Sequence, residues 1–355
     1  ADGAAGAIPL LHNYGCLRLK PDNDRAYRTL VGLGSNPNVA GSLLLEIGCG
    51  MLEPDRIANG IAATGTPAEL VSVKAAGGYR KAIEIGTAAA RSMLAKASMQ
   101  QRVPMPLGKL SVGVKCGGSA TISSAAGHPA TGHVVDAVID AGGTVIFSET
   151  AEVIGAEHLL AKRAANEQVK KDLLETVHRF EQMIIDYGVD IRGAQPMPGN
   201  ILNGLTTIEE KSLGALVKTG TRPLNGVLDY AERPSAPGLY LMDSPAWPVH
   251  MFLGMAAAGN QVFIFSLGGG VCGMFPSQPG ALRPPIVPTV KITGDPTLKP
   301  EMDFFDFYAG AVIEGRESKE SASARFMETF IDIVSGKPTT QEDSSYREIL
   351  DFYAA

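Results

Sequence analysis

The sequence predicts an α/β fold: two Rossmann-like doubly wound domains with mainly parallel sheets. Apolar segments of strand length alternate along the chain with segments of helical periodicity, which is the pattern of such sheets. Several apolar segments, such as "AGSLLLEIG" and "KLSVGVKCGG", end in Gly, as strands that enter a tight turn do. The composition agrees, because 45% hydrophobic residues and 41 Gly in 355 residues suit a compact protein with many turns.

The first part of the chain contains one β-α-β-α alternation. The pattern predicts strands over residues 40–48 and 68–78, and helices over 56–65 and 78–98. The following segment "QQRVPMPLGKL" contains two Pro and a Gly, which is typical of a linker. We therefore expect a first α/β domain over residues 1–105, incomplete at its N-terminus, and a larger C-terminal catalytic domain over 106–355.

The second part continues the alternation. It predicts strands over residues 109–118, 144–150, 238–244 and 260–270, and a loop leading into a strand over 283–295. It predicts helices over residues 133–143, 156–187, 208–220 and 323–337, with a loop over 192–207. The segment 156–187 carries the longest helical pattern in the chain.

Charge and hydropathy exclude several classes of protein. The net charge is −6 without a long basic run, so neither nucleic acid nor an anionic membrane surface is expected as a partner. No apolar run is long enough to span a bilayer, and the start of the chain does not resemble a signal peptide. The four Cys form no CxxC pair, and we expect a reduced, cytoplasmic protein. The chain lacks an initiator Met, which suggests that it begins partway through a gene product.

Three Cys share a Gly-rich context. Cys16 lies in "HNYGC" with His12, Cys49 follows an apolar strand in "EIGCG", and Cys116 follows another in "VKCGGS". Ligands of open α/β sheets bind beyond the carboxyl ends of the strands, so at least two of these thiols are expected at the mouth of a cleft. Three thiolates can hold an iron–sulfur cluster, or His12 and thiolates can hold mononuclear iron or zinc. The alternative is that these Cys are small buried apolar residues.

Polar groups near other predicted strand ends are candidates for contacts with substrate. Glu149 ends a strand, where a carboxylate can act as a general base or ligate a metal, whereas Glu152 or Glu157 can serve a helix N-terminus. Asn200 and Lys211 are candidate substrate ligands, although a solvated Lys is the commoner case. Further candidates lie in two Gly-rich turns: Gly117, Gly118, Ser119, Gly268, Gly269 and Gly270. The roles of His128 and His133 stay open between catalysis and structure.

Taken together, these segments resemble one known family. The motifs "HNYGC", "IGCG", "KCGGS", "AGGTVIFSETAEVIGAEHLL", "QPMPGN", "LTTIEEKSLGA" and the Gly run after "VFIFS" occur in that order. They resemble the galactarate dehydratase/altronate dehydratase family, which also contains the large subunit of sulfolactate sulfo-lyase. The resemblance covers nearly the whole chain. It implies an iron-dependent lyase that removes a proton beside a carboxylate and expels water or sulfite from a small hydroxy acid.

The resemblance also implies roles for particular residues. Cys16, Cys49 and Cys116 fall on the family's cysteine motifs, which implies that they hold iron, as Fe²⁺ or as an iron–sulfur cluster. His12 falls on the His paired with them, and we place it with Glu149 and Lys211 in the expected catalytic set. Lys218 is expected to hold a small anionic substrate together with Lys211 and the Gly turns. The family's sugar-acid members carry a further domain or small subunit before this region, so we expect a small partner subunit or a missing N-terminal segment, and a homo-oligomer.

Two departures from the sugar-acid members bear on the substrate. Ala120 stands where those members resemble "CGGSD", and the loop "LGGGVCG" lacks the Arg of their "TGRGTP". Because a polyol needs many hydroxyl partners, these losses favour a short hydroxy acid with an anionic β substituent, as in sulfolactate. A galactarate- or altronate-type dehydratase is the second interpretation. A non-catalytic protein that binds a small acid or a metal is the third.

Overall fold

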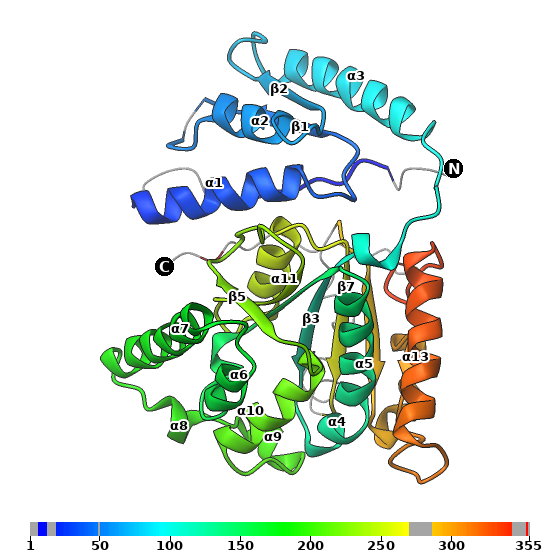
Figure 1. Cartoon of the computed structure of the whole chain (residues 1–355). Coiled ribbons are helices and arrows are strands. Elements are labelled where there is room, and N and C mark those ends of the chain that lie inside the picture. Colours follow the sequence, from blue (N-terminus) through cyan, green and yellow to red (C-terminus); the bar gives the residue numbers. More distant parts are fainter. Residues whose placement is uncertain (1–5, 13–18, 49, 270–285, 343–352, 354–355) are drawn as a thin grey trace.

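The computed structural model describes residues 6–12, 19–48, 50–269, 286–342 and 353. Figure 1 shows a small α/β unit, in blue and cyan, lying above a larger unit that is built around one sheet. The helices of the small unit are α1 (Lys20–Gly34), α2 (Pro54–Ala62) and α3 (Tyr79–Ala97). Those of the larger unit are η1 (Leu107–Lys109), α4 (Thr121–Ala125), α5 (Gly127–Asp140), η2 (Thr150–Glu152), α6 (Glu157–Lys162), α7 (Glu167–Asp186), α8 (Ile191–Ala194), α9 (Pro198–Leu202), α10 (Ile208–Leu216), η3 (Val217–Thr219), α11 (Pro248–Ala257), η4 (Pro296–Phe304) and α13 (Lys319–Val334).

Within the described part of the chain, a seven-stranded sheet forms the centre of the larger unit. Its strands are β3 (Ser111–Gly117), β4 (Thr144–Ser148), β5 (Leu224–Leu228), β6 (Gly238–Met242), β7 (Val262–Leu267), β8 (Thr289–Thr293) and β9 (Phe307–Tyr308). The order is β5-β6-β4-β3-β7-β8-β9, and every neighbouring pair is parallel. The central strands are rich in Val, Ile and Phe and are buried on both faces, as parallel strands covered by helices are.

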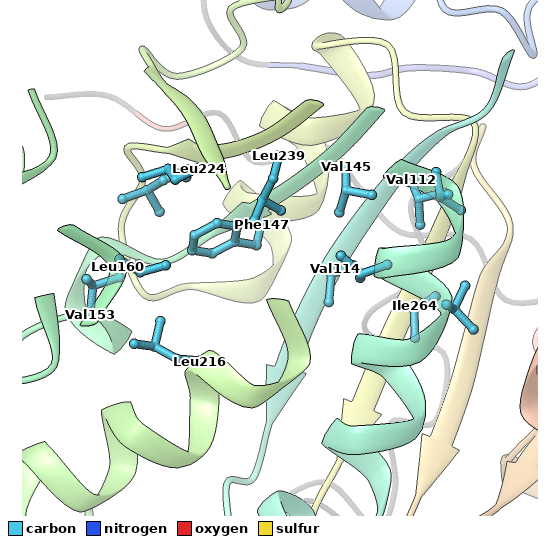
Figure 2. Close-up of a cluster of buried hydrophobic side chains, with 14 of the residues drawn as sticks. Val112, Val114, Val145, Phe147, Val153, Leu160, Leu216, Leu224, Leu239 and Ile264 are labelled. Atoms are coloured by element: carbon cyan, nitrogen blue, oxygen red, sulfur yellow. The ribbon is translucent and has the colours of Figure 1, made fainter. Parts of the chain in front are cut away.

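Helices cover both faces of this sheet. On one face, α5 and α13 pack against the strands, and Figure 2 shows part of that core, with Val112, Val114, Phe147 and Ile264 among its buried side chains. On the other face, α11 packs against the strands, where the Phe252 ring lies edge-on to Phe265. Burying one such side chain contributes about 1.5–3 kcal/mol, so the two cores hold the strand ends in register. The predicted α/β class with mainly parallel sheets is confirmed.

The small unit contains a two-stranded parallel sheet of β1 (Ser42–Glu46) and β2 (Ala68–Ser72) in the described residues. Leu44 is paired with Leu70, and α2 connects the two strands, as in a β-α-β unit. Helix α3 follows β2 and packs on both strands. The order strand, helix, strand, helix is the order that the sequence pattern predicts for this region.

Helix α1 lies before these strands but packs on α11 of the larger unit. Asn36, just after α1, donates from Nδ2 to the backbone oxygens of Ala256 and Asn260, at 2.8 and 2.9 Å. Gly32 lies so close to Ala257 that an added Cβ would collide with its carbonyl group. These contacts attach α1 to the larger unit. The domain boundary expected at residue 105 stays a prediction.

The helix predicted over residues 156–187 is two helices, α6 and α7. Between them the backbone of residues 163–165 pairs with Leu224 at the start of β5. Asn166 then caps α7, its side chain accepting a hydrogen bond from the N–H of Val169 at 3.0 Å. The break is therefore caused by a contact with a strand about sixty residues further along, which helical periodicity does not contain.

Other elements were not predicted. Strand β5 and helices α1 and α11 had no assigned counterpart, and the expected loop 192–207 contains the short helices α8 and α9. Pro198 starts α9 at a position where a missing backbone N–H costs nothing, so here Pro begins a helix and does not exclude one. Among the described helices, none combines the length and the apolar character needed to cross a bilayer.

Candidate functional site

The strand order reverses between β3 and β7. From β3 the chain places β4, β5 and β6 on one side, with β6 between β4 and β5, and then returns to place β7, β8 and β9 on the other. In open parallel sheets this switch point is where ligands bind, beyond the carboxyl ends of the strands. Gly268 donates its N–H to the backbone oxygen of Gly117 at 3.0 Å, so the two Gly turns predicted from the sequence lie side by side here.

Five polar side chains form a buried cluster at these strand ends. Lys115 Nζ is hydrogen-bonded to Glu149 Oε2 and lies 3.2 Å from Glu152 Oε1. Lys218 Nζ donates to Glu152 Oε2 at 2.7 Å, and Cys116 Sγ donates to Glu152 Oε1 at 3.0 Å. None of the five side chains is more than 6% exposed, so the cluster balances its charges internally and not through solvent.

The surroundings shift the pKa values of the two carboxyl groups of the cluster in opposite directions. Burial raises the pKa of Glu149, and the negative charge of Glu152 raises it further against the opposing effect of Lys115. Burial also acts to raise the pKa of Glu152, but the charges of Lys115 and Lys218 hold it well below its usual range. Glu152 is therefore the permanent anion, and Glu149 is the carboxyl group that can gain and lose a proton.

Glu149 is held in an unusual backbone conformation. Its φ and ψ are both 84°, a region that residues other than Gly rarely adopt. The N–H of Glu149 donates to Ser244 Oγ at 3.0 Å, and Thr150 Oγ1 donates to Asp243 Oδ1 at 2.6 Å. These bonds tie the turn after β4 to the turn after β6. Backbone strain of this kind is concentrated at functional sites.

Lys211 and Asn200 approach the cluster from α10 and α9. Lys211 is half-buried and donates from Nζ to Gln195 Oε1 at 3.0 Å. The positive charge of Lys211 lowers the pKa of both Glu149 and Glu152, although burial and nearer charges have larger effects on these pKa values. Lys211 therefore lies near both carboxyl groups. Asn200 Nδ2 donates to the backbone oxygen of Ser119 at 3.0 Å. Asn200 thereby fixes the turn that follows Cys116, and Lys211 brings a half-buried cation close to the cluster.

His128 lies at the start of α5, also close to the cluster. Its Nδ1 is 2.7 Å from the backbone oxygen of Gly214, and because a carbonyl oxygen only accepts, Nδ1 carries the proton. Nε2 is then an acceptor, and no donor among the described residues reaches it. Burial, followed by the charge of Lys218, lowers the pKa of His128 to about 4. The ring is neutral at neutral pH.

The structure brings together many, but not all, of the residues singled out in the sequence. Those that lie around the switch point are Gly117, Gly118, Ser119, Cys116, Glu149, Asn200, Lys211, Lys218, Gly268 and Gly269. His12 is exposed, and Cys16, Cys49 and Gly270 lie outside the described residues. The roles expected for these four residues stay predictions. Lys218 is buried, with Nζ bonded to Glu152 and to the backbone oxygen of Ala215, so its expected contact with substrate also stays a prediction.

The described residues do not by themselves form a metal site. No group of three or more His, Cys, Asp and Glu side chains among them is arranged to hold a metal ion. Burial raises the pKa of the Cys116 thiol to about 11, and the thiol donates its proton to Glu152. An iron site made by Cys16, Cys49 and Cys116 is therefore a prediction that rests on two residues outside the described part of the chain.

Two members of the cluster were not recognised as functional in the sequence. The sequence offers a helix N-terminus for Glu152 or Glu157, but in the structure the carboxylate of Glu152 is bound by Lys115, Lys218 and Cys116. Lys115 was read only as part of an apolar strand. A Lys inside such a strand is itself a signal, because a buried ammonium needs a carboxylate partner. The motif "SET" at the end of β4 supplied that partner in Glu149.

Comparison with known proteins gives matches over both parts of the chain. Residues 107–354 match the model of the D-galactarate/altronate dehydratase C-terminal region, and residues 1–98 match that of the D-galactarate dehydratase/altronate hydrolase second domain. The chain is 34% identical to (2R)-sulfolactate sulfo-lyase subunit beta of Chromohalobacter salexigens, over 99% of this chain and 88% of that protein. It is 30% identical to altronate dehydratase of Bacillus subtilis, over 97% of this chain and 67% of that protein.

A third relative has a longer chain. Galactarate dehydratase (L-threo-forming) of Escherichia coli is 32% identical over 89% of this chain, a region that makes up 60% of that protein. All three relatives are named as lyases or dehydratases. The family resemblance read from the sequence motifs is confirmed, and the chain belongs to the galactarate/altronate dehydratase family of lyases.

Proposed function

We propose that this lyase eliminates water or sulfite from a small hydroxy acid at the cluster around Glu149. One observation carries the proposal: a buried carboxyl group with a raised pKa, held in a strained backbone conformation, lies at the switch point beside Lys115 and Lys211. A carboxyl group in such surroundings is suited to remove a proton and to return it. The names of the relatives support an elimination as the reaction class.

In the proposed reaction, the half-buried Lys211 binds the carboxylate of the substrate beside the cluster. Ionised Glu149 removes the proton from the carbon beside that carboxylate. The electron pair of the broken C–H bond becomes the C=C bond, and the bond to the β leaving group breaks with its electrons on that group. Sulfite leaves as an anion, whereas loss of water requires a proton, and Glu149 returns to the leaving oxygen the proton that it has taken from carbon.

The remaining charges of the cluster position this base. Glu152 accepts from Lys218, Lys115 and Cys116, so it stays ionised and does not compete for the proton. Its negative charge makes Glu149 a stronger base, because it disfavours a second anion nearby. Lys218 keeps this arrangement neutral overall and is a positioning residue in this scheme.

Iron is kept as a proposed cofactor, supported by the placement of the three Cys motifs and the family resemblance. When bound, iron would act as a Lewis acid that polarises an oxygen of the substrate. Elemental analysis of anaerobically purified protein tests this point separately from activity. Absence of iron, with Cys16→Ala and Cys49→Ala proteins as active as the unchanged protein, would remove iron from the proposal.

We also propose a small partner subunit, a homo-oligomeric assembly and a cytoplasmic location. The name of one relative, a subunit beta, supports a partner chain, since that protein is by its name one component of a larger enzyme. Intact mass of the native complex isolated from cells identifies any companion chain and the number of copies. Full activity of this chain as a lone monomer would contradict the proposed assembly.

Two substrates are considered. A sulfolactate-like acid is favoured by Ala120 and the Arg-less Gly turn, and by the relative that is named for sulfolactate. A sugar acid of the altronate or galactarate type is favoured by the relatives that are named altronate dehydratase and galactarate dehydratase. A side-by-side assay of sulfite release from sulfolactate and dehydration of altronate and galactarate separates the two. Turnover of none of the three acids would overturn the proposed function.

A further inference from the structure

Asp243 is an acid that the proposed elimination does not use, although it lies beside the base. It follows β6 directly, and the end of β6 is paired with the end of β4, which Glu149 follows. Asp243 Oδ1 accepts the hydrogen bond from Thr150 Oγ1 at 2.6 Å, and Oδ2 is paired with Arg179 on α7. Both carboxylate oxygens are therefore bonded, one to the residue next to Glu149 and the other to a helix that packs against η2.

Thr150 is the link between Asp243 and the base. It is fully buried, and its hydroxyl donates to Asp243 while accepting from the N–H of Ser244 at 3.3 Å. The N–H of Thr150 donates to the backbone oxygen of Ser244, also at 3.3 Å. Because the N–H of Glu149 donates to Ser244 Oγ, the turn is held on both sides of the base. The bond to Asp243 has a charged acceptor, which makes it a strong one.

Glu149 needs such support because its backbone is strained. Its φ of 84° lies in the left-handed region, which an L side chain leaves when its neighbours permit. A shift of this backbone towards an ordinary conformation would move the carboxyl group away from its place in the cluster. Misplacing a reacting group by about 1 Å can lower a rate about 100-fold. The bonds that hold the turn therefore bear on the rate of the reaction.

We propose that Asp243, held in place by Arg179, is a positioning residue that acts through Thr150 to keep the carboxyl group of the base aligned for proton removal. The inference rests on the proposed elimination at Glu149. The side chain of Arg179 is 60% exposed and that of Asp243 is 21% exposed, so the ion pair connects the surface of α7 to the buried turn. Asp243 does not bind the substrate in this scheme, so its loss should lower kcat and leave KM nearly unchanged.

The test uses the full-length protein and whichever acid it turns over. Thr150→Val keeps the shape of the side chain and removes the hydroxyl, and we expect kcat to fall about tenfold to 100-fold with KM within about twofold. Asp243→Ala should give a similar loss. The double variant should lose no more than the larger single loss, because both changes break the same bond. Asp140→Ala, which breaks an exposed ion pair with Arg222, is the matched control and should keep full activity.

Two further variants keep the test decisive. Thr150→Ser retains the hydroxyl, so it should keep kcat within about threefold of the unchanged protein. Arg179→Met alters an exposed position and tests the same chain of bonds if the buried variants fail to fold. We expect its kcat to fall at least about threefold, because Asp243 loses the partner that orients it. An unchanged kcat in Arg179→Met would overturn the inference in that case.

The pH profile separates positioning from a general loss of folded protein. Burial and the charge of Glu152 raise the pKa of Glu149, against the effects of Lys115 and Lys211. When Thr150→Val lets the carboxyl group leave its buried position, the acid-side midpoint of kcat/KM should move towards the ordinary glutamate value. A smaller fraction of folded enzyme lowers the rate at every pH alike and leaves the midpoint in place.

The contrary outcomes fall into two groups. Unchanged kcat in folded Asp243→Ala and Thr150→Val, losses that multiply in the double variant, or a lower kcat with an unmoved midpoint would each overturn the positioning role, while the elimination at Glu149 would stand. If Glu149→Gln keeps its activity, or if the unchanged protein turns over none of the three acids, the proposed function fails and the inference fails with it.

Discussion

Lys218 and Glu152 form an ion pair that is closed off from solvent: Nζ and Oε2 are 2.7 Å apart, and the side chains are 1% and 4% exposed. The two residues are 66 positions apart, one from η3 and the other from η2. Removing two charges from water is costly, and their mutual attraction offsets that cost only while both partners are present. The pair therefore contributes to the stability of the fold, and Lys218 also helps to keep Glu152 ionised at the site.

Removal of Lys218 should destabilise the protein strongly. Lys218→Met leaves the carboxylate of Glu152 buried with one cation fewer, and we expect the free energy of unfolding to fall by about 3–5 kcal/mol. Urea unfolding followed by circular dichroism measures this change. Lys170→Met, which breaks an exposed ion pair with Glu167, should change the same free energy by less than about 1 kcal/mol. Similar small changes in both proteins would contradict the burial argument.

The pH dependence of turnover should report Glu149. The base must be ionised to remove a proton, and burial together with the charge of Glu152 raises its pKa. We therefore expect kcat/KM to fall on the acid side with a midpoint clearly above the ordinary glutamate pKa of about 4.3. Initial rates between pH 4.5 and 9 measure the midpoint. A profile that stays flat to the acid limit, with the protein still folded, would exclude Glu149 as the base.

His128 should make the protein sensitive to acid. Its folded pKa of about 4 is below the unfolded value of about 6.5, so the unfolded chain binds the proton first. The stability that follows from this difference is fully present above pH 6.5 and is lost as the pH falls towards 4. Between pH 7 and pH 5 the free energy of unfolding should drop by about 2 kcal/mol more in the unchanged protein than in His128→Gln. In His133→Gln, which replaces an exposed His, the free energy of unfolding should drop as much as in the unchanged protein. The same drop in all three proteins would refute the prediction.

Two helical glycines should respond in opposite directions to the same substitution. In Gly32→Ala the new Cβ meets the backbone of Ala257, which cannot move aside, so the contact of α1 with α11 should be lost and the thermal midpoint should fall by several degrees. In Gly86→Ala on α3 the nearest atoms are ordinary contacts at 3.5 Å, and the higher helix propensity of Ala should raise stability by up to about 1 kcal/mol. Thermal unfolding of both proteins measures the contrast. Equal effects would show that α1 does not pack as described.

The sheet and part of the site could be predicted because their signals are local. The central strands are short apolar runs, two of which run into Gly, and the parallel arrangement follows from the helices between them. Glu149 was identified because it follows an apolar strand, at the end where ligands of open α/β sheets bind. Asn200 and Lys211 were identified differently, from a Pro-rich loop that leads into a helix and from the preference of Lys for carboxylate and sulfonate groups.

What the sequence did not contain is long-range pairing. The break between α6 and α7 depends on Leu224, and the role of Glu152 depends on Lys218, in both cases about sixty residues away. Such contacts are made by the packing of separate elements, and no spacing rule within one element predicts them.

The central claim is that Glu149 is the base of an elimination. Its most direct test is kcat of Glu149→Gln, measured with whichever acid the unchanged protein turns over. The substitution keeps the backbone bond to Ser244 and the size of the side chain, and we expect kcat to fall by about 10²–10⁴-fold while circular dichroism and KM change little. Glu175→Gln, on the exposed side of α7, should keep full activity. A folded Glu149→Gln protein that retains more than about a tenth of the original kcat would contradict the account.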